Sequence, residues 1–208
     1  MREGGGDPVE LGPPPTGLPV LEDRWCRPRA LDNPVRRWLF PAVRDMERLD
    51  PPVGGWVVDL GAGIGFHAVE WLRRIGPQGR LVLVDPDAEN LALTPPTAAA
   101  DLRLERIVAP ASRVPQLPSD AIDRVLLSFV LCCLVDKEGA LDETWRILRP
   151  GGRALVCYPR ARRTPSRRRP LRMTVRRWEE LQSRHAWSFR PVRGNRFVDR
   201  HLLEKPVA

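Results

Sequence analysis

The sequence is poor in lysine, tyrosine and cysteine. Its 34 basic residues include only two lysines, Lys137 and Lys205, and Tyr158 is its single tyrosine. The four cysteines are Cys26, Cys132, Cys133 and Cys157. None of them forms a CxxC pair, so the spacing predicts no metal site, and we expect reduced thiols packed in the core.

Long apolar runs are missing as well. The longest, 81–84 and 125–135, are short or interrupted by Ser128, whereas a membrane-spanning helix needs about 20 apolar residues. The first residues also lack the apolar stretch of a secretory signal. With 42% hydrophobic and 29% charged residues over 208 positions, the composition is typical of a globular protein. We therefore expect a cytoplasmic protein without membrane contact.

Acidic residues are absent from one segment, 160–177, which contains nine arginines. The whole chain has a formal net charge of +8, so the remainder is close to neutral. This distribution predicts one basic insertion in a neutral domain, rather than a protein that coats nucleic acid over its whole surface.

The N-terminal fifth of the chain divides into two parts. Residues 1–20 are rich in glycine and proline and are predicted to be a flexible arm. In residues 21–50, apolar side chains recur every three or four positions from Leu31 to Leu49, which predicts an amphipathic helix with a bend at Pro41. We interpret this helix as an N-terminal lid.

Strand and helix patterns alternate from residue 51 onward. Apolar runs predict strands at 56–60, 80–84, 104–108, 122–131 and 154–158, and helical periodicity predicts helices at 66–75 and 137–148. Pro95 and Pro96 interrupt the crossover at 91–101, where we expect a short helix and a loop. After the arginines, a helix at 178–184 and strands at 187–192 and 196–203 are expected. This order predicts a single α/β domain with a doubly wound, Rossmann-like sheet.

The strongest chemical signal is a glycine-rich turn between a strand and a helix. Residues 57–66 read Val-Val-Asp-Leu-Gly-Ala-Gly-Ile-Gly-Phe, and bare glycines let the backbone approach a ligand at a helix N-terminus. Asp85 follows Gly65 by twenty residues, where a carboxylate can accept ribose hydroxyls. The spacing differs from the dinucleotide fingerprint, and Asp59 before the turn would oppose a pyrophosphate but suit a cation. A cationic ligand that contains adenosine is therefore predicted.

These segments resemble the class I S-adenosylmethionine-dependent methyltransferases. Residues 58–65 are similar to the first motif of the family, Val84-Asp85-Pro86 to its ribose-binding acid, 123–127 to its fourth strand and 140–152 to the helix and turn before its fifth strand. The resemblance covers about 31–156 and is nearest to the small-molecule branch that includes quinone methyltransferases. It implies a domain at 51–208, a seven-stranded sheet whose last strand is antiparallel, and S-adenosylmethionine as the methyl donor.

The turn and the resemblance together predict a donor site. Its expected residues are Asp59, Gly61, Ala62, Gly63, Gly65, Phe66, Asp85, Pro86, Ser112 and Ser128. Ser112 is included because Pro110-Ala111-Ser112-Arg113 stands where relatives commonly have an acidic residue near the adenine, so Ser112 or the backbone would make that contact.

Methyl transfer needs no dedicated base, because positioning and exclusion of water supply much of the rate. No catalytic residue is assigned; the candidate acid or base groups are His67, His185, His201, Asp136 and Tyr158. We expect His185 and His201 to be solvated. Cys132 and Cys133 are interpreted as core packing, with a nucleophile or an arsenic ligand as alternatives.

Three functions remain open. The leading hypothesis is a methyltransferase for a small, partly apolar molecule. Residues 128–131 lack the Asn/Asp-Pro-Pro-Tyr motif of amino-group methylases. With only two lysines, the chain also cannot form the Lys-Asp-Lys-Glu tetrad of ribose methylases. The first alternative is an RNA or ribosomal methyltransferase that binds phosphates through Arg160–Arg177. The second is a protein that binds the donor without turnover.

Overall fold

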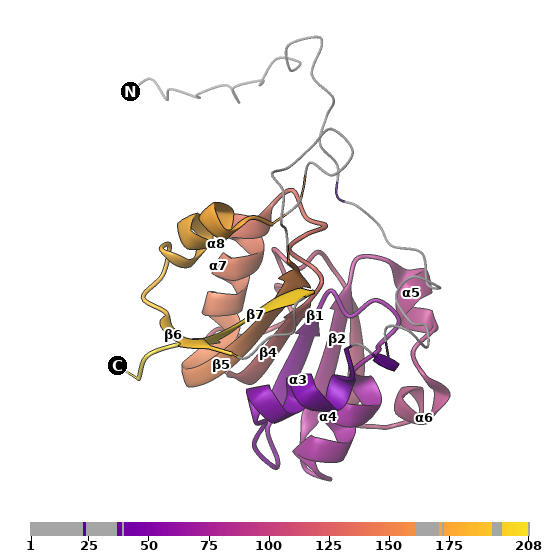
Figure 1. Cartoon of the computed structure of the whole chain (residues 1–208). Helices are drawn as coiled ribbons and strands as arrows, with labels where there is room; N and C mark the ends of the chain where they lie inside the picture. The colour runs from indigo at the N-terminus through magenta and orange to yellow at the C-terminus, as the bar shows by residue number, and fades with distance from the viewer. Residues whose placement is uncertain are drawn as a thin grey trace, which may run out of the picture.

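The computed structural model describes residues 23, 37, 38, 40–160, 171, 173–192 and 197–207. The expected arm at 1–20, most of the helix at 31–49 before Phe40, and 161–170 and 172 of the basic insertion lie outside these residues. The described chain folds into one mixed sheet with helices on both faces (Figure 1).

The sheet has the strand order β3-β2-β1-β4-β5-β7-β6. Its seven strands are β1 (Trp56–Leu60), β2 (Arg80–Asp85), β3 (Leu104–Val108), β4 (Ile122–Ser128), β5 (Leu148–Pro159), β6 (Ser188–Pro191) and β7 (Val198–Glu204). Strands β1 to β5 are parallel, and β7 runs antiparallel to both β5 and β6. The order reverses between β1 and β4, and ligands of such sheets bind at the carboxyl ends of the strands beside this point.

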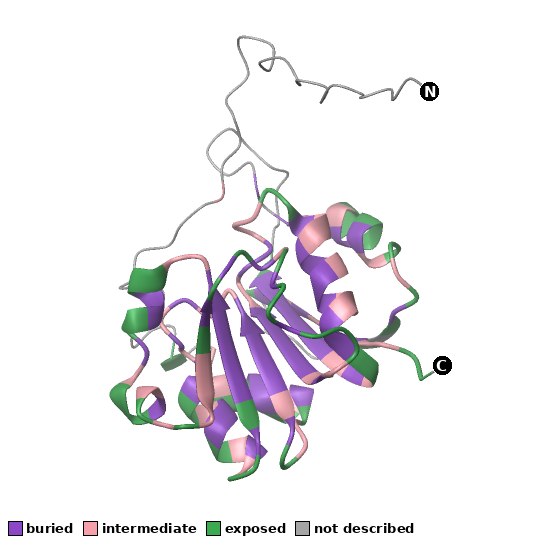
Figure 2. Ribbon diagram, turned by 180° about the vertical axis from the view of Figure 1, so that it is seen from behind, coloured by how far each residue is buried: buried purple, intermediate pink, exposed green. Residues whose placement is uncertain are grey.

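The helices form a layer on each face (Figure 1). One layer holds α3 (Ala42–Leu49), α4 (Ala68–Ile75), α5 (Ala88–Ala92) and α6 (Pro96–Ala99); the other holds α7 (Lys137–Ile147) and α8 (Val175–Gln182). Successive strand residues alternate between the layers, so Val57 packs toward α4 and Val58 toward α7. The central strands are therefore buried on both faces (Figure 2). The predicted Rossmann-like α/β architecture is confirmed.

The predicted bend at Pro41 is a break between helical segments, and one predicted strand ends early. Residues 37 and 38 are helical and α3 begins at Ala42, because Pro41 is extended (φ −63°, ψ 131°) and has no N–H for a continuous helix. The predicted strand 122–131 ends at Ser128 as β4, since Phe129 has a positive φ of 63° that turns the chain. The predicted interruption at 91–101 separates α5 from α6.

No helix in the described ranges combines the length and the apolar character that crossing a membrane requires.

Candidate functional site

The glycine-rich turn leaves the carboxyl end of β1. Gly61, Gly63 and Gly65 have φ values of 74°, 56° and 72°, a region that favours glycine. The N–H groups of Gly61 and Ala62 donate to the carbonyl of Val84 at 2.7 and 2.9 Å, which ties the turn to β2. A Cβ on Gly61 would lie 2.4 Å from Val130 Cγ2, so the turn packs directly against the chain that follows β4.

Asp85 lies beside this turn at the end of β2. Its carboxylate is 7% exposed and accepts hydrogen bonds from the N–H of Gly63 at 2.7 Å and of Asp87 at 3.0 Å. Burial raises the pKa of Asp85, and the two backbone donors oppose that shift. Pro86 follows and is half-buried. Because each carboxylate oxygen has two lone pairs, Asp85 can still accept from vicinal hydroxyls.

Ser128 and Phe129 end β4 on the other side of the switch point. The Ser128 hydroxyl is buried and has no hydrogen-bond partner within the described part of the chain, which is unusual unless a ligand supplies one. Phe129 donates its N–H to the Cys157 carbonyl at 2.8 Å, and its ring lies 5.5 Å from that of Phe40. A bulky residue at positive φ is rare and marks strain that is common at functional sites.

The segment after β3 reaches the same edge. Ala109 donates its N–H to the Asp85 carbonyl at 3.2 Å, so the chain runs from β3 toward the end of β2. Ser112 follows the buried Ala111 in a turn and is half-buried. The predicted adenine-side residue is thus placed on the segment that starts next to Asp85.

Asp59 belongs to a buried ion network that also contains Asp45, His67 and Arg200. His67 Nδ1 lies 3.6 Å from Asp59 Oδ2, and its Nε2 lies 3.5 Å from Asp45 Oδ2. Arg200 on β7 donates to Asp45 at 2.9 Å. Burial alone raises the pKa of Asp45, but His67 and Arg200 together hold it below its ordinary value. His67, 3% exposed, therefore joins elements in the core, with the half-buried Phe66 ring edge-on to it at 4.9 Å.

Two other candidate acid or base groups stabilise local structure. Asp136 accepts from the Gly139 N–H at 2.8 Å and caps α7. His185 bonds Asp142 at 2.8 Å and stacks on Trp145 with ring centroids 4.8 Å apart. The expectation that His185 is solvated is therefore wrong: it is half-buried because α7 supplies both a carboxylate and a ring.

His201 also differs from its expected solvated position. It is half-buried between rings, with its centroid 4.2 Å from Trp178, and its Nε2 lies 2.8 Å from the Tyr158 hydroxyl. Burial lowers the pKa of His201 to about 4, so the imidazole is neutral near pH 7. Burial raises the pKa of Tyr158, so its hydroxyl stays protonated near pH 7 and is not available as a base.

The described arginines of the basic insertion are paired with acids. Arg160 bonds Asp199 at 2.7 Å, and Arg176 bonds Glu180 at 3.0 Å. Arg177 pairs with Glu138. These three side chains are thus partly neutralised, which weakens the case for phosphate binding at this end of the segment.

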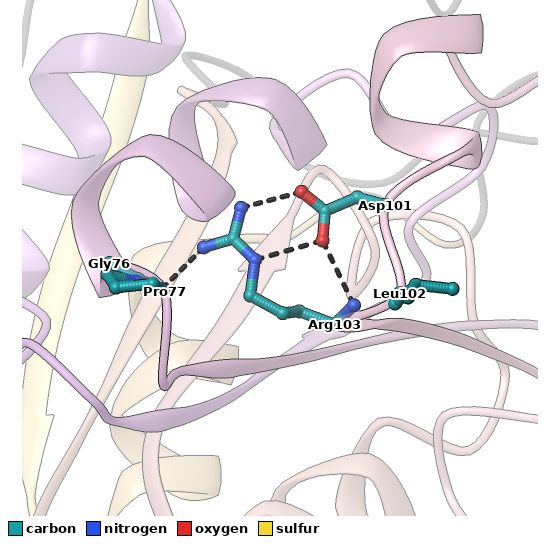
Figure 3. Close-up of a pocket in the computed structure, with 5 residues that line it drawn as sticks. All are labelled: Gly76, Pro77, Asp101, Leu102 and Arg103. Atoms are coloured by element: carbon teal, nitrogen blue, oxygen red, sulfur yellow. Dashed lines mark hydrogen bonds and ion pairs between the residues drawn. The ribbon is translucent and has the colours of Figure 1, made fainter.

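A shallow hollow lies at the amino ends of the parallel strands, opposite the glycine-rich turn. It is placed between the end of α4 and the start of β3 (Figure 3). Its lining residues are Gly76, Pro77, Asp101, Leu102 and Arg103. Arg103 bonds both Asp101 oxygens at 2.9 and 2.6 Å and the Leu72 carbonyl at 3.0 Å, and it also bonds the Gly76 carbonyl. Its guanidinium is occupied in holding α4 to β3, so the hollow is structural. Across the described ranges, no three His, Cys, Asp or Glu side chains gather as a metal site.

Residues 58–156 match the family profile described as "Methyltransferase domain". This segment is similar to methyltransferase domains. It contains the glycine-rich turn, Asp85, Ser112 and Ser128. The predicted resemblance to methyltransferases is thereby confirmed.

The chain is also similar in sequence to curated methyltransferases. The ubiquinone/menaquinone biosynthesis C-methyltransferase UbiE of Geobacter sulfurreducens is 34% identical over 124 residues, which cover 58% of this chain and 47% of that protein. The chain thus spans about half the length of the curated relatives it matches.

Solved structures agree in fold. A SAM dependent methyltransferase from Aquifex aeolicus superposes with a TM-score of 0.74 at 17% identity, covering 85% of this chain and 96% of the other. Phosphoethanolamine N-methyltransferase 2 of Haemonchus contortus, solved with phosphomonomethylethanolamine and S-adenosylhomocysteine, gives 0.66 at 14%, covering 82% of this chain and 56% of the other. At these identities the likeness shows the fold of the methyltransferase domain alone.

Sequence reasoning missed several residues around this domain's edge. Phe129 had no signal, because the apolar run 122–131 continues through it and no pattern predicts its positive φ. Phe40 had none, because its partner lies 89 positions away. Asp45 and Arg200, separated by 155 positions, had none either.

Proposed function

We propose that this protein is an S-adenosylmethionine-dependent methyltransferase that acts on a small-molecule acceptor. The observation that carries the proposal is the buried hydroxyl of Ser128, which has no partner among the described residues and lies at the same sheet edge as Asp85 and the glycine-rich turn. An unsatisfied buried hydroxyl costs about 1–3 kcal/mol, which a bound ligand would recover. The donor residues of this edge therefore fit S-adenosylmethionine.

Each predicted donor residue has a role that its position supports. Asp85 would accept the ribose hydroxyls, and the backbone of Gly61, Ala62 and Gly63 would approach the amino-acid end. Gly65 has a positive φ and lies in the turn that leads into α4. S-adenosylmethionine supplies an electrophilic methyl group on a sulfonium.

The remaining donor contacts would come from four side chains. Phe66 and Pro86 offer half-buried apolar surface. Ser112 would contact the adenine, and Ser128 would donate or accept one hydrogen bond. Asp59 would act indirectly, since it is 1% exposed and lies against His67. Its charge would favour a cationic ligand near the turn.

Positioning would supply the catalysis. The candidate bases are engaged in caps, stacks or the buried ion network, so no side chain of the described chain is assigned as a base. Holding an acceptor atom in line with the transferable methyl group and excluding water lowers the barrier without one.

The N-terminal lid is proposed to form one wall of the acceptor site. Phe40 packs on Phe129, and Asp23 accepts from the Val135 N–H at 2.7 Å. Both contacts bring residues of the predicted lid to the turn after β4. The aromatic pair favours a partly apolar acceptor.

Calorimetry with S-adenosylhomocysteine tests the donor site. We expect the wild type to bind and Asp85→Asn to weaken binding by about 10–100-fold, as loss of a charged hydrogen-bond acceptor implies. Asp101→Asn is the matched control, since Asp101 lies at the opposite edge, and it should bind like the wild type. A wild type that does not bind, or an Asp85→Asn protein that binds equally well, contradicts the proposal.

A methyl-transfer assay separates the enzymatic from the binding-only function. Product formation with small apolar acceptors supports the methyltransferase, whereas donor binding without transfer to any acceptor supports a protein without turnover. Transfer to RNA that weakens steeply with salt would support the alternative that uses Arg160–Arg177.

A further inference from the structure

Two adjacent cysteines stand in the turn that follows β4. Cys132 and Cys133 are both half-exposed, and their sulfurs lie 3.8 Å apart. Each thiol donates to the carbonyl of Phe129, at 3.3 and 3.5 Å. The pair therefore faces one backbone atom of the residue whose φ is positive.

The turn that holds the two cysteines packs against the glycine-rich turn through Val130. Cys133 donates its N–H to the Val130 carbonyl at 2.8 Å, and Val130 packs so closely on Gly61 that no Cβ would fit there. A change in the backbone at the two cysteines must pass through Val130, because packed interiors have little free space to absorb it.

A buried lysine, Lys137, follows Cys133 by four residues at the start of α7. The Lys137 side chain is buried and donates to the Leu134 carbonyl. Burial and Arg177 lower the pKa of Lys137, while Cys132 and Cys133 act to raise it. The thiolate is the form of a cysteine that reacts with disulfides.

We propose that Cys132 and Cys133 are a reversible redox modification site, at which a small disulfide such as oxidised glutathione forms a disulfide between the two adjacent residues. One thiolate attacks oxidised glutathione, forming a mixed disulfide and releasing one glutathione thiolate. The second thiolate attacks the protein sulfur of that mixed disulfide, forming the new bond and releasing the second glutathione. Both cysteines are oxidised, one glutathione disulfide is reduced to two glutathiones, and their thiolates take up the two protons.

The product would be strained and hence easy to reduce. Adjacent α-carbons are about 3.8 Å apart, below the usual separation of about 4.4–6.8 Å in disulfides. Strained disulfides have more oxidising potentials and are typical of regulatory sites. Cys157 does not compete, since it is buried and burial raises its pKa well above the usual range.

Oxidation would weaken donor binding, a consequence that rests on the proposed function. Closing the short ring removes both S–H donors from the Phe129 carbonyl and alters the turn next to Val130. The glycine-rich turn then loses the packing that holds it in its binding conformation.

The test compares reduced protein with protein treated with oxidised glutathione. Intact mass should show the loss of two hydrogens without a glutathione adduct, and peptide mapping should place the bond between Cys132 and Cys133. The affinity for S-adenosylhomocysteine should fall about tenfold, equivalent to about 1.4 kcal/mol, and a reducing agent should restore it. Amide exchange of the peptide 61–65 should rise on oxidation, a readout that needs no ligand.

Single variants serve as matched controls. Cys132→Ser and Cys133→Ser should each bind S-adenosylhomocysteine like reduced wild type and retain one glutathione as a mixed disulfide. Cys26→Ser should still form the disulfide and show the same rise in exchange.

The proposal is overturned by a stable mixed disulfide on the wild type, by a disulfide that includes Cys26 or Cys157, or by a disulfide at 132–133 with unchanged exchange at 61–65. If reduced protein fails to bind S-adenosylhomocysteine, the proposed function fails, and the mass and exchange measurements still decide the redox site.

Discussion

At the scale of single residues, the glycine-rich turn depends on the absence of one carbon atom. Gly61→Ala would place a Cβ 2.4 Å from Val130 at a φ of 74°. Left-handed backbone costs about 1–2 kcal/mol for alanine, and overpacking adds about 1–3 kcal/mol. We expect the free energy of unfolding in urea to fall by about 2–5 kcal/mol.

The companion double variant separates these two costs. Adding Val130→Ala to Gly61→Ala should recover the overpacking part but not the backbone part, giving a coupling energy of about 1–3 kcal/mol in a double-mutant cycle. Additive effects of the two substitutions would show that Val130 does not close the turn.

Replacement of Ser128 by alanine should have opposite effects on the stability of the ligand-free protein and on its affinity for S-adenosylhomocysteine. Ser128→Ala removes a buried hydroxyl without a described partner, so the ligand-free protein should be unchanged or stabilised by about 1–2 kcal/mol in thermal unfolding. Affinity for S-adenosylhomocysteine should fall about 3–10-fold, since a neutral hydrogen bond is worth about 1 kcal/mol. Lower stability together with unchanged affinity would make Ser128 a structural residue.

At the scale of elements, the buried ion network joins α3 and β7 to the turn. Arg200 is 6% exposed and Asp45 is 2% exposed. Arg200→Met leaves the carboxylate of Asp45 without its buried guanidinium partner, which should cost about 3–5 kcal/mol in denaturant unfolding. Removing both charges in Asp45→Leu/Arg200→Met should cost less than Arg200→Met alone. If the double variant is the less stable, Asp45 stabilises the fold through His67 rather than through Arg200.

Predictions at the element scale succeeded where local pattern and tertiary packing agree. The strand before the glycine-rich turn is apolar except for Asp59, and β1 and β3 begin and end at the predicted residues. The prediction was wrong beyond Ser128, because Phe129 continues the apolar pattern of a strand but turns the chain. Hydrophobicity does not encode φ, so the end of β4 could not be found from the pattern.

At the scale of the whole molecule, His201 should make stability depend on pH. Its pKa is lowered to about 4 in the folded protein, against about 6.5 in the unfolded chain. Between these values the unfolded state binds more protons, so stability is lost as the pH falls from about 6.5 to about 4. The loss should reach about 2 kcal/mol, after a discount for the half-buried position.

Urea unfolding at a series of pH values measures this dependence. His201→Gln, which can still bond the Tyr158 hydroxyl, should flatten the slope between about pH 4 and 6.5. His185→Gln is the matched control, since His185 is half-buried with a carboxylate partner. A slope that persists in His201→Gln would assign the pH dependence to other groups.

The sequence by itself determined the class of fold and the position of the glycine-rich turn, because periodicity and glycine spacing are local properties of the chain, and its motifs carried the resemblance to methyltransferases. The donor-site residues that it predicted stay predictions, although Asp85 and Ser128 lie at the edge where the proposal needs them. Only the tertiary structure decided which distant residues meet, as Asp45 with Arg200, Phe40 with Phe129 and Val130 with Gly61. Such contacts depend on how the sheet and its two helix layers pack together, and no pattern along a single chain contains that information.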